Sequence, residues 1–75
     1  MEHSLKSVYD VQQLLKRYGI FVHVGERLWD LELMMDELRK IYQTHLIERD
    51  VFVSAMVILK KEHQWEQEHM DQKNN

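Results

Sequence analysis

Three stretches of this chain repeat apolar residues at intervals of three and four, which is the spacing of one face of an α-helix. They cover residues 4–18, 26–43 and 48–66. Because the chain has no proline and only two glycines, nothing inside these stretches interrupts a helix. A chain of 75 residues has room for one small domain, and each helix alone buries only one face. The pattern therefore predicts an all-α, antiparallel three-helix bundle.

The segment between the first two stretches differs in kind. Residues 20–24 are β-branched or aromatic and favour extended backbone, yet the chain has no second strand-like run to pair with them. We therefore expect an extended connector between helices 1 and 2 that lays alternate side chains over the bundle. In the turn before the third helix, we expect His45 near the left-handed region and Leu46 and Ile47 packed inward.

The shared helical faces also predict the extent of the domain and its core. We expect a single domain over residues 1–66, followed by a polar tail at residues 67–75 that frays. The expected core is drawn from all three stretches: Leu15, Leu31, Leu38, Phe52, Met56 and Leu59.

Composition and spacing argue against most kinds of catalytic site. Without cysteine, the chain has no disulfide, no thiolate metal site and no thiol nucleophile. His63 and His69 do not have the spacing of a helical zinc motif, so we expect no metal and no cofactor. Four carboxylates of the second stretch are expected on a solvated helix face: Asp30, Glu32, Asp36 and Glu37. We therefore predict a protein that is not an enzyme, with no catalytic residue and no small-molecule substrate.

The sequence also lacks the signals of a membrane or secreted protein. No apolar run is long enough to span a bilayer, and residues 1–6 do not resemble the start of a secretory signal. We therefore expect a cytoplasmic protein with no membrane partner.

Basic and aromatic residues flank the connector. Lys16, Arg17 and Tyr18 end the first stretch, and Arg27 opens the second. A site for single-stranded nucleic acid combines a basic groove with stacking rings, so these residues form the candidate site. Cations at a helix C-terminus also simply balance the helix dipole. The formal charge of −3 argues against coating of duplex DNA and predicts weak binding confined to one local groove.

Two apolar residues support an alternative function. Trp29 and Leu33 fall beside the main apolar stripe of the second stretch, which makes them a candidate interface. Residues 38–59 also resemble short bacterial helical hairpins associated with oligomerisation. The alternative is therefore a protein–protein interaction or oligomerisation module, such as an adaptor or a homo-oligomer. Convergence of Lys16, Arg17 and Arg27 around Tyr18 or Trp29 would favour nucleic acid. Their dispersal over separate faces, with Trp29 in a self-contact, would favour the adaptor.

Several motifs occur together along the chain. They lie at residues 9–19 (YDVQQLLKRYG), 25–27, 30–34, 36–38, 38–42 and 46–47. Together, over roughly residues 8–62, they resemble the YqgQ-like family of small bacterial proteins. The resemblance implies a cytosolic three-helix bundle that binds single-stranded DNA or RNA and has no catalytic activity. The chain departs from the family pattern at His45, where glycine is frequent, and at Met35, where an acidic residue is usual.

Overall fold

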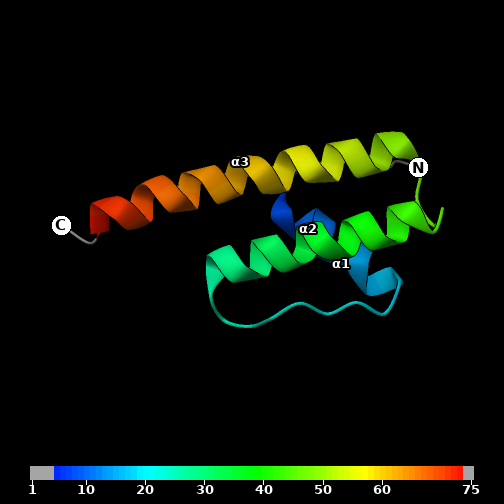
Figure 1. Ribbon diagram of the computed structural model, residues 1–75, viewed down its shortest axis with the longest axis horizontal. Helices are drawn as coiled ribbons and strands as arrows, with labels where there is room; N and C mark the ends of the chain where they lie inside the picture. The colour runs from blue at the N-terminus through cyan, green and yellow to red at the C-terminus, as the bar shows by residue number, and fades with distance from the viewer. Residues whose placement is uncertain (1–4, 74–75) are drawn as a thin grey trace.

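The computed structural model describes residues 5–73, and the side chains of residues 5–70 (Figure 1). This part of the chain folds into three helices: α1 (Val8–Arg17), α2 (Arg27–Gln43) and α3 (Arg49–Lys73). Figure 1 shows α2 and α3 side by side and antiparallel, with α1 crossing this pair obliquely. The predicted all-α three-helix bundle is therefore confirmed.

Helix α1 begins later than the sequence pattern indicates. The expected start at Ser4 lies outside the described residues, and the first helical residue is Val8, because Ser7 and Asp10 form a capping box. Asp10 N donates to Ser7 Oγ at 3.3 Å, and Asp10 Oδ2 accepts from Ser7 N at 3.2 Å. This reciprocal pairing satisfies backbone groups that the first helical turn leaves open.

Helix α2 ends in a left-handed residue, as predicted. His45 has a φ of 65°, its N–H donates to Tyr42 O at 3.0 Å, and Leu46 N donates to Ile41 O at 2.9 Å. This pair of bonds defines a Schellman motif, and the same pattern ends α1 at Gly19, whose φ is 76°.

The two residues after His45 behave differently from one another. Ile47 is half-buried and packs against the core, as expected. The prediction that Leu46 packs inward is wrong, because Leu46 is 53% exposed. The Schellman motif uses the N–H of Leu46, and the Tyr18 hydroxyl donates to its carbonyl at 3.1 Å. The backbone of Leu46 is therefore held at the bundle end while its side chain faces solvent.

The connector lays alternate side chains over the bundle, as predicted. Ile20 and Val22 pack partly buried against the core, whereas Phe21 and His23 are exposed. The connector runs back along the length of α2, so the chain enters α2 at the end far from Gly19 (Figure 1).

The return of the connector is fixed by one carboxylate. Asp30 Oδ1 accepts from Val24 N at 2.6 Å, and Asp30 Oδ2 accepts from Gly25 N at 3.4 Å. The N-cap residue Glu26 makes no side-chain capping bond, so Asp30 holds the entry to α2 instead.

The core draws on all three helices. Its buried residues are Val11, Leu14, Leu15, Leu31, Met34, Met35, Leu38, Ile41, Ala55, Met56 and Leu59. Five of the six predicted core residues are in this set, and the sixth, Phe52, is only partly buried. Phe52 instead stacks on Tyr42 with ring centroids 4.3 Å apart, which joins α2 to α3 near their connecting turn.

Helix α3 is longer than predicted. It continues to Lys73, whereas the sequence pattern indicated an end near Glu66. Its last turns extend past the start of α2 (Figure 1), so α2 does not pack against them. Good helix-forming residues and local pairs, such as the 3.3 Å bond from Gln64 to Glu68, maintain the helix without a periodic apolar stripe.

Candidate nucleic-acid interface

The four residues of the sequence-predicted site are divided between the two ends of the bundle. Tyr18 lies beside the turn after α2, where its hydroxyl donates to Leu46 O, and Lys16 and Arg17 precede it in the last turn of α1. Arg27 starts α2, which has 17 residues and is about 25 Å long. Lys16, Arg17 and Arg27 therefore do not converge on one ring. This dispersal is the outcome expected for the interaction module, so a nucleic-acid site has to be built from other residues.

Lys16 belongs to a hollow of its own on the connector side. It lines a space of about 400 Å³ with residues of the connector, including the exposed Phe21 and His23. Tyr18 and Arg27 do not contribute to this hollow.

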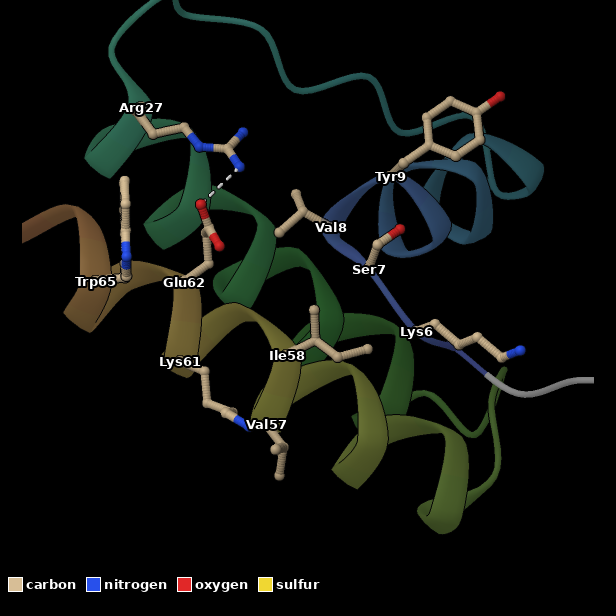
Figure 2. A pocket seen from close by; sticks show the side chains of 10 residues that line it. All are labelled: Lys6, Ser7, Val8, Tyr9, Arg27, Val57, Ile58, Lys61, Glu62 and Trp65. Carbon is tan, nitrogen blue, oxygen red and sulfur yellow. Dashed lines mark hydrogen bonds and ion pairs between the residues drawn. The ribbon is translucent and has the colours of Figure 1, made fainter.

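Arg27 lies in a larger groove between the start of α1 and the middle of α3. This space of about 760 Å³, here called the α1–α3 groove, is shown in Figure 2. Its lining residues are Lys6, Ser7, Val8, Tyr9, Arg27, Val57, Ile58, Lys61, Glu62 and Trp65. Figure 2 shows Lys6 and Tyr9 on the α1 side and Trp65, Arg27 and Glu62 at the other end. Val8 and Ile58 lie between these two polar ends.

The two aromatic residues of the α1–α3 groove are exposed. Tyr9 is 64% exposed and Trp65 is 50% exposed. The Trp65 ring stacks on His69 with centroids 3.6 Å apart, and His69 Nδ1 lies 2.8 Å from Trp65 O. The contact with the backbone carbonyl holds the His69 ring in place, and the stacking restrains the Trp65 ring, so less rotamer freedom is lost when a ligand binds to Trp65.

The cations of the groove are partly neutralised. Arg27 Nη2 lies 3.2 Å from Glu62 Oε2, and Arg27 Nε lies 3.9 Å from Glu66 Oε2. No ion pair within residues 5–70 involves Lys6 or Lys61. The groove thus offers two lysines and one arginine that already has acidic partners.

Sequence reasoning missed Lys6, Tyr9, Lys61 and Trp65. The oblique crossing of α1 over α3 brings these residues to one groove, although more than 50 positions of sequence separate Lys6 from Lys61. The spacing of charged and aromatic residues along the chain carries no signal for this crossing. Only Arg27 was identified in advance.

The candidate interface at Trp29 and Leu33 forms another concave surface, separate from the Lys16 hollow and the α1–α3 groove. These side chains, with Val24 of the connector, line a hollow of about 370 Å³ whose other lining residues are Glu32 and Asp36. We call this surface the α2 hollow. Its three apolar residues are all exposed, and they form one continuous patch rather than isolated side chains.

Two further features of the described part of the chain bear on its chemistry. No helix there is long and apolar enough to cross a membrane. No group of three or more histidine and carboxylate side chains is arranged there to hold a metal ion.

The fold defines the class of the protein, a small all-α three-helix bundle. The chain belongs to the YqgQ-like family, whose pattern matches residues 5–65. It is 43% identical over 58 residues to the uncharacterized protein YqgQ of Bacillus subtilis (strain 168). This match covers 77% of the chain and 82% of the relative. The resemblance expected from the sequence motifs is therefore confirmed.

Proposed function

We propose that the protein binds single-stranded nucleic acid in the α1–α3 groove. The observation that supports this proposal is that exposed aromatic side chains and cations line one concave surface, with Arg27 and Trp65 at one end and Tyr9 and Lys6 on its outer rim (Figure 2). Sequence-independent binding of single strands combines these two features, because cations follow the phosphates and rings stack on the bases.

The charges of the groove set the expected strength of binding. Lys6 and Lys61 provide positive charge that makes no ion pair with another side chain of residues 5–70, whereas Glu62 pairs with Arg27 and repels phosphate. The formal charge of −3 adds no long-range attraction. Binding is therefore weak and confined to the groove, and it weakens further as salt is added.

The proposal is tested by fluorescence anisotropy with a labelled oligothymidine of about 12 nucleotides, a length within the range bound by small single-strand sites. A Lys6→Ala, Lys61→Ala double variant removes two cations of the groove. We expect weaker binding and a salt slope reduced by about 1.4, because each lost phosphate contact on a single strand changes the slope by about 0.7.

The matched control is a Lys16→Ala, Arg17→Ala double variant. It removes the same charge from the end of α1, outside the groove. Similar losses in both double variants would show that only net charge matters. A larger loss of affinity in the control would show that the site lies at the end of α1 instead. Absence of binding by the unmodified protein at low salt would contradict the proposal.

A further inference from the structure

The α2 hollow is a surface that nucleic acid binding leaves unused. Trp29 is 62% exposed, and Leu33, one helical turn later, lies on the same face of α2. Val24 is held beside them because the Asp30 carboxylate accepts from its backbone N–H at 2.6 Å. The connector wall of the hollow is thus held in place and the other wall belongs to helix α2, so an apolar side chain that enters the hollow gains burial without ordering the backbone of either wall.

The polar part of this surface is acidic. Its other lining residues are Glu32 and Asp36, and no lysine or arginine lines it. Glu32 Oε2 lies 2.8 Å from His63 Nε2, and Asp36 Oδ1 lies 2.8 Å from Arg39 Nη1. The Glu32 and Asp36 side chains nevertheless stay 56% and 60% exposed, so both carboxylates remain accessible to an incoming cation.

We propose that the α2 hollow docks a basic amphipathic segment of a partner protein. The apolar side chains of that segment would fill the space between Val24, Trp29 and Leu33. Its lysine or arginine side chains would pair with Glu32 and Asp36, which fixes the orientation and favours cationic over acidic sequences.

The same charges argue against other occupants. Two copies of this chain joined hollow to hollow would bring the Glu32 and Asp36 carboxylates of both copies into one interface, where like charges repel. The α1–α3 groove of a second copy carries cations, but it is itself concave and does not fill another concave surface. Nucleic acid is repelled by the acidic rim.

The two tryptophans of the chain allow this surface to be observed separately. A Trp65→Phe variant leaves Trp29 as the sole tryptophan. The probes are a synthetic helical peptide of leucine and lysine with an amphipathic pattern and the same peptide with glutamate in place of lysine. We expect saturable binding of the lysine peptide, with a shift of Trp29 emission to shorter wavelength.

Variants in the full-length protein test the chemistry. Trp29→Ala should weaken binding of the labelled lysine peptide at least about tenfold, as truncation of an interface anchor does. Glu32→Gln with Asp36→Asn should weaken it by up to about tenfold, the effect of two exposed ion pairs. The matched control, Glu48→Gln with Glu68→Gln, removes the same charge from α3 and its preceding turn and should leave affinity unchanged. Circular dichroism checks that each variant is folded.

The proposal would be overturned by no change in Trp29 emission, by equal binding of the two peptides, or by equal weakening by the two charge-removing double variants. Sedimentation that shows a dimer in the unmodified protein and a monomer in the Trp29→Ala variant would also overturn it, because a second copy would then occupy the hollow. The oligothymidine titration reports on the α1–α3 groove and the peptide experiments report on the α2 hollow. Failure of one proposal therefore does not affect the other.

Discussion

Leu38 of α2 is fully buried in a core cluster to which all three helices contribute. Leu38→Ala should lower the free energy of unfolding by about 2–5 kcal/mol, because the substitution removes buried methyl groups and leaves a cavity. Urea denaturation measures this change. The control Leu46→Ala truncates an exposed leucine and should change the free energy by less than about 0.5 kcal/mol. Comparable losses in the two variants would contradict the assigned core.

His45 shows a different kind of constraint, one of backbone conformation. Its φ of 65° is strained for a residue with a Cβ atom and costs glycine nothing. His45→Gly should therefore be neutral or should stabilise the protein by up to about 1 kcal/mol. Gln43→Gly, at a helical position two residues earlier, should destabilise it by about 0.5–1 kcal/mol. Thermal denaturation compares the two, and an equal loss in both would contradict the strain argument.

At the residue scale, the features that could be predicted from the sequence are those that depend on neighbouring residues in the chain. The helix end at His45 follows from the tolerance of a residue type for a backbone conformation, and five core residues follow from helical periodicity. Leu46 could not be placed in this way. Its exposure depends on the turn that positions its backbone against Tyr18, a contact between distant parts of the chain.

The elements are held together by contacts that join their ends. The Tyr18 hydroxyl donates to Leu46 O at 3.1 Å and so connects the C-terminus of α1 to the turn after α2. Tyr18→Phe keeps the ring and removes only this bond, and it should lower the free energy of unfolding by about 0.5–1.5 kcal/mol. Because Tyr18 lies outside the α1–α3 groove, oligothymidine affinity should not change. Tyr9→Ala, which removes a ring of the groove, should weaken that affinity. The opposite pattern in the anisotropy titration would place the stacking residue at Tyr18.

The lengths of the elements were only partly predictable. The capping box at Ser7 and the left-handed Gly19 are local signals, and they set the bounds of α1. The end of α3 has no such signal. The change to polar residues after Glu66 marks where the helix stops packing on α2, and the helix itself continues to Lys73 because its residues favour helix.

At the scale of the whole molecule, the route of the connector determines which residues share a surface. Because the connector returns along α2, the basic end of α1 and the start of α2 lie at opposite ends of the bundle (Figure 1). The same route leaves Arg27 beside Glu62 and Glu66 of α3. A linear reading of the sequence placed Arg27 near Lys16 and Arg17, and the direction of the connector could not be obtained from residue type or spacing.

In this arrangement the ion pairs with Glu62 and Glu66 compete with phosphate for Arg27. Glu62→Gln with Glu66→Gln removes both of its acidic partners and leaves the side chains nearly the same size. We expect tighter binding of oligothymidine and a salt slope that is steeper by about 0.7, because one more cation becomes available to phosphate. Since both ion pairs are partly exposed, the free energy of unfolding should fall by no more than about 1 kcal/mol.

Two controls separate the release of Arg27 from a change in net charge. Glu32→Gln with Asp36→Asn removes the same charge from the α2 hollow, where no residue of the groove lies. This variant should produce a smaller gain in affinity for oligothymidine, limited to the long-range effect of net charge. Adding Arg27→Ala to the Glu62→Gln, Glu66→Gln variant should abolish most of the gain, because the released cation is then absent. A gain that persists without Arg27 would mean that the two glutamates act on nucleic acid through repulsion alone, with the arginine held only as part of the fold.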